Sequence, residues 1–137
     1  MEYQELGRTG RVVSRLGFGG APAGLTNYLS NYTPEDLEQR RQVIAAIERA
    51  LDLGVTYFDT APAYGQGASE AIFGEALAGL GDEIFVATKV VPAQKDVRAS
   101  VEASLERLQR DAIDLLQIHG SSYSMATAEA FLAPEGM

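Results

Sequence analysis

The apolar and polar positions of the chain fall into blocks that predict strands alternating with helices. Three short runs rich in β-branched and aromatic residues, VTYFDT, EIFVATKV and IDLLQIH, predict strands at residues 55–60, 83–90 and 113–119. Between these runs, apolar residues recur every three or four positions, which indicates helices with one buried face. An order in which strands and helices alternate is typical of parallel β/α units joined by right-handed crossovers.

The first residues predict a hairpin followed by a short strand. YQELGRTGRVVSRLG, residues 3–17, pairs two strand-like runs around a glycine-containing turn. RLGFGGAP, residues 15–22, predicts a short apolar strand that ends at two glycines and a proline, and a polar loop follows it to about residue 33. The glycines resemble a phosphate-binding turn. However, Pro22 and the long loop do not open the helix that a dinucleotide fingerprint requires.

Capping residues indicate where the helices begin and end. Thr33 stands before a proline and two carboxylates, which predicts a helix start at this hydroxyl. Ser69 and Asp96 are expected to cap the next two helices, and Gly54 lies where a helix-terminating glycine belongs. The segment MATAEAFLAP, residues 125–134, predicts a last short helix.

Three successive predicted strands end in a polar residue. These residues are Asp59, Lys89 and His119, and the interval is 30 residues each time (89 − 59 and 119 − 89). Regular units of this size bring strand ends side by side, at the edge of the sheet where parallel α/β folds bind ligands. Tyr64 follows Asp59 in the loop APAYG. The sequence therefore predicts that four polar side chains meet at one end of the sheet.

These four side chains could deliver a proton to a carbonyl oxygen. A phenol is a weak acid at neutral pH, and an ammonium about 4 Å away contributes roughly 4 kcal/mol in favour of the phenolate. Lys89 could therefore make Tyr64 a competent acid, Asp59 could hold Lys89, and His119 could hydrogen-bond a substrate oxygen. Taken singly, each residue also has an ordinary interpretation: a turn-forming aspartate, a surface aromatic, a solvated lysine and a partly buried histidine.

The motifs GFGGA, YFDTAPAYGQGASE, VATKV and DLLQIH resemble those of the aldo-keto reductases, in order and spacing. The resemblance implies a TIM-type (β/α)8 barrel in which NADPH donates a hydride to an aldehyde or ketone; NADH is not excluded. It also implies that Tyr64 is the acid, that Lys89 and Asp59 support it, and that His119 orients the substrate. Gly19, Gly20 and Ala21, together with Asp59, would lie beside the nicotinamide.

The resemblance covers a hairpin and about four β/α units of an eight-unit barrel. The chain is therefore expected to be a single aldo-keto reductase-like domain, residues 1–137, that forms a half barrel truncated after its fourth unit. Such a half barrel is expected to self-associate through its open strand edges and to be inactive alone. A non-catalytic binding or assembly module that uses those edges is the alternative function, and a flavodoxin-type doubly wound domain is a third interpretation of the fold.

Composition and charge exclude several other classes of protein. The net charge of −8 argues against a nucleic-acid or anionic-membrane surface, because phosphates attract the opposite sign. The sequence has no cysteine and one histidine, which excludes disulfides and thiolate metal sites and predicts no metal. No segment has the pattern of a signal peptide or a membrane span, so a cytoplasmic protein that acts on a small carbonyl or alcohol is expected.

Overall fold

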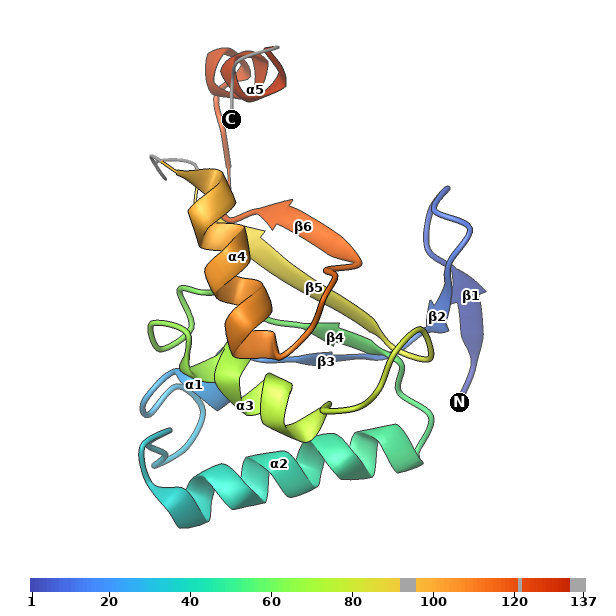
Figure 1. Ribbon diagram of the computed structural model, residues 1–137, viewed down its shortest axis with the longest axis vertical. Coiled ribbons are helices and arrows are strands. Elements are labelled where there is room, and N and C mark those ends of the chain that lie inside the picture. Colours follow the sequence, from blue (N-terminus) through green and yellow to red (C-terminus); the bar gives the residue numbers. More distant parts are fainter. Residues whose placement is uncertain (92–95, 121, 134–137) are drawn as a thin grey trace.

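Four parallel strands and the helices on one of their faces form the body of the molecule (Figure 1). The computed structural model describes residues 1–91, 96–120 and 122–133. The strands of the main sheet are paired in sequence order and have these bounds: β3 (Gly17–Gly19), β4 (Tyr57–Asp59), β5 (Phe85–Val90) and β6 (Leu115–Ile118). A two-stranded antiparallel hairpin precedes them, formed by β1 (Tyr3–Glu5) and β2 (Val12–Ser14). The sheet is thus a curved half of a barrel, as the sequence predicts.

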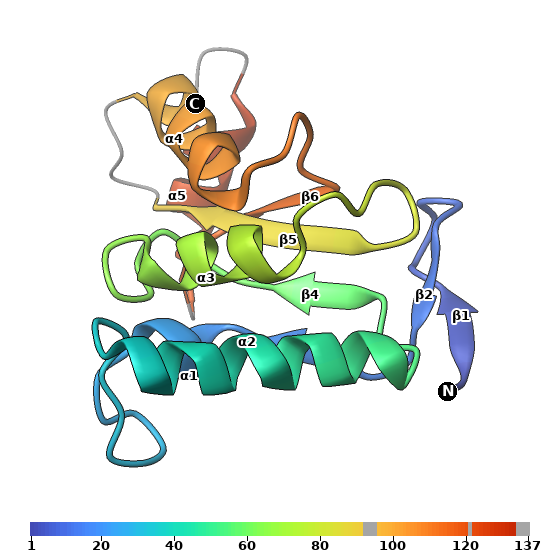
Figure 2. The ribbon, with the colours of Figure 1, turned by 60° about the horizontal axis from the view of Figure 1, so that its bottom comes forward.

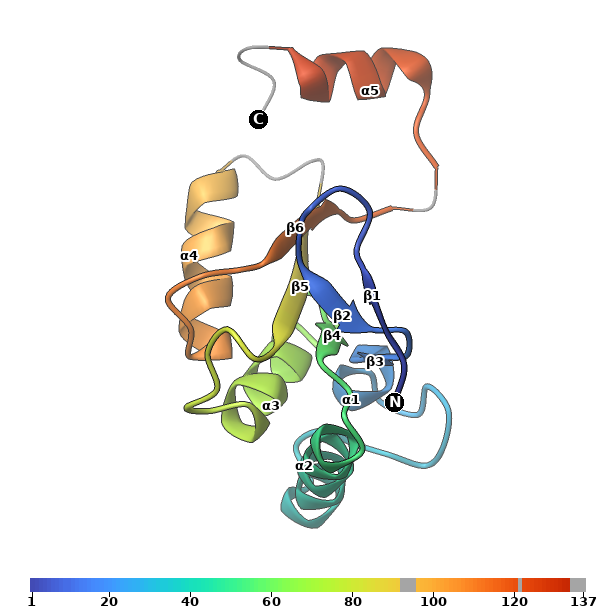
Figure 3. The same cartoon turned by 90° about the vertical axis from the view of Figure 1, so that its right-hand side faces the viewer.

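The helices follow the strands in the order that β/α units require. Their bounds are α1 (Ala21–Gly24), α2 (Leu37–Asp52), α3 (Ala68–Ala76), α4 (Val97–Leu108) and α5 (Met125–Leu132). Figure 2 shows α2 and α3 lying side by side along the sheet. Helix α5 stands apart from the body of the molecule (Figures 1 and 3).

Alternate residues of each strand face the helices or the concave side of the sheet. Phe58 and Val86 are fully buried and pack with residues of α2, α3 and α4 in the hydrophobic core. Their neighbours Tyr57 and Phe85 lie on the concave face, where their rings stack with centroids 5.4 Å apart. Because side chains alternate along a strand, Asp59 shares the concave face with Tyr57.

Two of the expected helix caps are wrong and one is confirmed. Asp36, rather than Thr33, caps α2, because its Oδ1 accepts hydrogen bonds from the backbone N–H groups of Glu38 and Gln39. Gly67 in a left-handed conformation, rather than Ser69, precedes α3. Asp96 caps α4 as predicted.

The sequence also makes predictions about Gly54 and about the segment after Gly20. Gly54 follows the end of α2 with φ +86°, the left-handed conformation that favours glycine after a helix, as predicted. The segment after Gly20 does form one helical turn, α1, although the sequence predicted a loop there. Its four residues are too few to show a helical period in the sequence.

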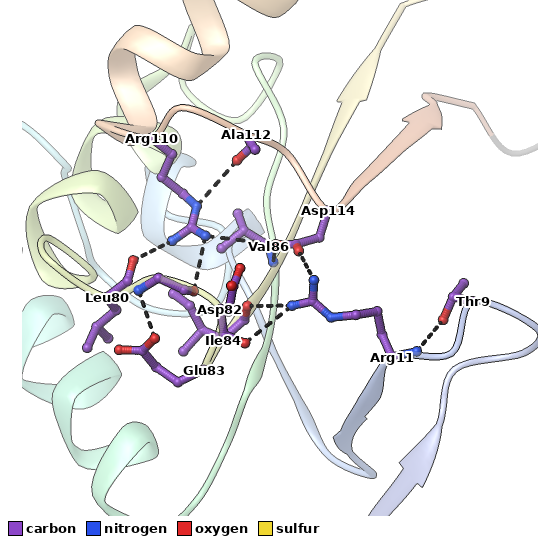
Figure 4. Close-up of polar contacts among 11 residues, drawn as sticks. Thr9, Arg11, Leu80, Asp82, Glu83, Ile84, Val86, Arg110, Ala112 and Asp114 are labelled. Carbon is purple, nitrogen blue, oxygen red and sulfur yellow. Dashed lines mark hydrogen bonds and ion pairs between the residues drawn. The ribbon is translucent and has the colours of Figure 1, made fainter.

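The hairpin is tied to the residues that precede β5 and β6 (Figure 4), whereas Asp59 and Lys89 lie near the other ends of their strands. Arg11 donates hydrogen bonds to the carbonyl oxygens of Asp82 and Ile84 at 3.3 and 3.4 Å. Its Nη1 also lies 3.1 Å from the Asp114 carboxylate, which in turn accepts a 2.9 Å bond from the Val86 backbone. Figure 3 shows the hairpin on one side of the strands and α3 and α4 on the other. The base of the concave face is therefore covered, and its other end is open.

Candidate active site

Asp59 and Lys89 form an ion pair at the open end of the sheet. Asp59 is the last residue of β4, and its Oδ1 lies 2.5 Å from Nζ of Lys89 in β5. The ammonium also donates a 2.7 Å hydrogen bond to the Thr60 carbonyl oxygen. The Lys89 side chain is only 11% exposed, so two acceptors hold it in a largely desolvated position.

The loop after β4 places the ring of Tyr64 beside this ammonium. Nζ of Lys89 lies 5.0 Å from the ring centroid of Tyr64. The loop turns back on itself after Tyr64 through Gly65, which has φ +66° and packs against the Gly24 backbone so closely that a Cβ at either glycine would collide. The Tyr64 carbonyl oxygen then accepts from the Ser69 backbone N–H at 3.2 Å. Tyr64 is therefore fixed by its own backbone contacts.

His119 follows β6 directly and completes the group that the sequence predicts. Its backbone N–H donates to the Val90 carbonyl oxygen at 2.8 Å, and its ring meets the Tyr64 ring edge-on with centroids 5.5 Å apart. Its Nδ1 is buried, and no group of the described residues hydrogen-bonds to it. An orphaned buried N–H is costlier than an orphaned lone pair, so Nε2 is the ring nitrogen better placed to donate a hydrogen bond to a ligand.

An open cavity of about 410 Å³ lies at this edge of the sheet. Its lining residues come from the loop after β4 and from the ends of β5 and β6: Tyr64, Lys89, Gln117, Ile118, His119 and Gly120. The cavity thus gives a small molecule access to the phenol, the ammonium and the imidazole at the same time.

Tyr57 also carries a phenol on the concave face of the sheet. It lies two residues before Asp59 on β4, farther from the open end. Burial, and to a lesser extent the Asp59 carboxylate, raise the pKa of Tyr57 above its ordinary value of 10.0. Tyr57 therefore stays neutral at neutral pH.

The three residues expected beside a nicotinamide differ in their surroundings. Gly19 ends β3 in register with Asp59, and a Cβ placed on it would meet nothing within 4 Å. Gly20 instead packs tightly, since a Cβ there would meet Ser69 Oγ at 2.5 Å. Ala21 begins α1 directly after it. The open space at Gly19, beside the Asp59 carboxylate, fits the close approach of a flat ring.

Ser69 and Gln117 are two polar residues of this region whose roles the sequence did not predict. Ser69 Oγ donates a 2.8 Å bond to the Gly20 carbonyl oxygen and contacts the Thr60 hydroxyl, which ties α3 to the strand ends. Gln117 donates from Nε2 to Oδ2 of Asp59 at 2.7 Å. The signal for Gln117 is its spacing: it lies two positions before His119 on the same strand face.

The described part of the chain contains neither a candidate metal centre nor a candidate membrane helix. In residues 1–91, 96–120 and 122–133, no three histidine or carboxylate side chains group as metal ligands would. Within the same ranges, none of the helices combines the length and the apolar character needed to cross a bilayer.

The chain is similar to known proteins in sequence and in fold. The chain is 42% identical over 108 residues to methylglyoxal reductase YeaE of Escherichia coli, covering 76% of this chain and 37% of that protein. It superposes on the thermostable aldo-keto reductase Tm1743 with a TM-score of 0.74 at 31% identity, covering 96% and 50% of the two chains. An aldo-keto reductase of Klebsiella pneumoniae, solved in complex with NADPH, gives a TM-score of 0.66 at 31% identity, covering 89% and 42%.

The chain therefore spans between about a third and a half of the length of these relatives. The matches cover 76% to 96% of this chain, and the model of the Aldo/keto reductase family matches residues 15–136. Because this family model covers most of the chain and the fold matches solved members, we conclude that the chain belongs to the aldo/keto reductase family.

Proposed function

We propose that this chain carries the proton-delivering side of an NADPH-dependent carbonyl reductase, with Asp59, Tyr64, Lys89 and His119 as its reactive group. The observation that supports this most directly is the ammonium of Lys89, which is held by Asp59 at 2.5 Å and lies 5.0 Å from the ring of Tyr64. In such a largely desolvated position a positive charge acts more strongly on a nearby phenol than it does in water.

Each of these residues has a separate role in the reduction. NADPH, when bound along Gly19, Gly20 and Ala21, supplies the hydride that reduces the carbonyl carbon. The Tyr64 hydroxyl gives its proton to the carbonyl oxygen, and Lys89 stabilises the phenolate that remains. The products are an alcohol, NADP⁺ and the Tyr64 phenolate, which regains its proton from water before the next turnover. NADH remains the second candidate for the cofactor.

His119 orients the substrate in this proposal. With the proton on Nε2, the imidazole donates a hydrogen bond to the same carbonyl oxygen that accepts the proton of Tyr64. The edge-on packing of the two rings, with centroids 5.5 Å apart, supports a shared target for their donors. The substrate is then a small aldehyde or ketone that fits the cavity of about 410 Å³.

The test is a hybrid barrel in which this chain replaces the matching segment of E. coli YeaE, the relative that is 42% identical to it. The hybrid supplies the rest of a barrel, and we expect it to consume NADPH when methylglyoxal is added. The measurement is the loss of NADPH absorbance, with NADH as the parallel reductant and circular dichroism to establish folding. A folded hybrid that binds NADPH but does not reduce methylglyoxal would contradict the proposal.

The alternative function, an assembly module, is supported by the exposed outer face of β6. Leu116 and Ile118 are 43% and 37% exposed, although their register partners on β5, Thr88 and Val90, are buried beneath helices. Apolar residues on the open edge strand of a sheet favour association. We expect the 137-residue chain to sediment as a dimer or larger species, and Ile118→Lys to shift it toward the monomer. A discrete dimer with no affinity for NADPH would favour this function over the reductase.

A further inference from the structure

Gln117 interacts with the one carboxylate of the site that also binds the ammonium. Its Nε2 donates to Oδ2 of Asp59 at 2.7 Å, whereas Oδ1 of Asp59 accepts from Lys89 at 2.5 Å. The two oxygens of this carboxylate are therefore each held by a donor from a different strand, Oδ1 by Lys89 of β5 and Oδ2 by Gln117 of β6. Two donors in fixed positions leave the carboxylate little freedom to rotate.

The contact between Gln117 and Asp59 spans an intervening strand. β5 lies between β4 and β6, so the two backbones are roughly 10 Å apart at the usual strand spacing. Ala87, the register partner of Asp59 on β5, carries only a methyl group, a short side chain at the point where the long amide crosses. A glutamine has the length for this crossing, whereas an asparagine is one methylene shorter.

An amide has a further property that suits it to this position. It donates a hydrogen bond without carrying charge, so it does not compete with Lys89 for the negative charge of Asp59. A lysine or arginine at residue 117 would draw the carboxylate away from Lys89. A glutamate would place a second negative charge against Asp59.

We propose that Gln117 is a positioning residue, which fixes Asp59 so that the carboxylate in turn fixes the Lys89 ammonium beside Tyr64. This inference rests on the proposed function, because it assigns Gln117 a role in the same proton-delivering group. The chain of contacts is direct: Gln117 to Asp59, Asp59 to Lys89, and Lys89 to the ring of Tyr64. Gln117 itself acts only through Asp59.

The test measures how firmly the Lys89 ammonium is held, without reference to catalysis. The sequence has only two lysines, Lys89 and Lys95, so Lys95→Arg leaves a single lysine signal in a ¹⁵N NMR spectrum. The rate at which the ammonium protons exchange with water at constant pH then reports the strength of its hydrogen bonds. In this background we expect Gln117→Met, which keeps the length but removes the donor, to speed exchange about tenfold.

Three further variants make the result specific. Gln117→Asn keeps the amide but shortens it, and we expect it to speed exchange as Gln117→Met does; it also replaces that variant if Gln117→Met fails to fold. Asp59→Asn removes the carboxylate and should have the largest effect. Gln42→Met changes an exposed glutamine of α2 and should leave exchange unchanged.

Two outcomes would overturn the proposal. One is exchange that is unaltered in Gln117→Met and Gln117→Asn while Asp59→Asn accelerates it. The other is a Lys89 ammonium that exchanges too fast to be observed even with Gln117 present, because it is then not held. Both are separate from the proposed function, which fails instead if the hybrid barrel does not reduce methylglyoxal, whatever the exchange rate of Lys89.

Discussion

Tyr64→Phe in the hybrid barrel is expected to lower kcat for methylglyoxal reduction about a thousandfold, within the range that general acids contribute. The substitution removes only the hydroxyl, so the ring still packs beside Lys89 and His119. Binding of NADPH should therefore change little while proton delivery stops. Steady-state turnover and nucleotide fluorescence, measured on the same sample, separate the two quantities.

Tyr57→Phe is the matched control for that substitution. Tyr57 lies on the same concave face as Asp59 but stacks on Phe85 at the covered base of the sheet. Its raised pKa keeps it neutral, so loss of its hydroxyl should leave kcat within about twofold. If Tyr57→Phe lowered kcat as much as Tyr64→Phe, or if Tyr64→Phe had no effect, Tyr64 would not be the proton donor.

Arg107→Met is expected to lower the free energy of unfolding of the chain by about 3 kcal/mol. Glu70 in α3 is completely buried, and its carboxylate accepts from Arg107 Nε at 2.7 Å and from the Thr88 hydroxyl at 2.6 Å. Removing the arginine leaves a buried carboxylate without its counter-charge. The value is at the low end for buried pairs because the Arg107 side chain is itself 30% exposed. Urea denaturation followed by circular dichroism measures the loss.

Two comparisons isolate the cause of this effect. Arg49→Met breaks an ion pair with Asp52 in which both side chains are about two-thirds exposed, and it should cost less than about 1 kcal/mol. Adding Glu70→Gln to Arg107→Met removes the buried charge and should recover part of the lost stability. A loss below about 1 kcal/mol for Arg107→Met alone would mean that the buried carboxylate finds another partner.

Spacing predicted the site more reliably than local propensity predicted the helix ends. Asp59, Lys89 and His119 do meet at one end of the sheet, because each β/α unit returns the chain to the same edge after 30 residues. Their position depends on the order of strands and helices along the chain. The spacing of hydrophobic residues predicts that order. Thr33 failed as a cap because Asp36, three residues later, offers a carboxylate to the same turn of helix.

The residues that the sequence did not predict are those whose partners are distant along the chain. Ser69 follows a glycine-rich loop like an ordinary capping residue, yet its hydroxyl is directed at the Gly20 carbonyl, 49 positions earlier. Gln117 stands among apolar residues and bonds to Asp59, 58 positions away. The spacing places Gln117 on the same strand face as His119, but neither pairing itself produces a local pattern, so both bonds are seen only in the folded sheet.

The tether formed by Arg11 and Asp114 has a consequence for engineering the molecule. It anchors the hairpin beside the start of β6 (Figure 4), whereas Lys89 lies near the other end of its strand, β5. Substitutions around this ion pair that raise the free energy of unfolding would not contact Tyr64 or Lys89. They should therefore avoid the usual trade-off between stability and activity. The end of the sheet that the hairpin contacts is therefore the first region in which to seek a more stable variant.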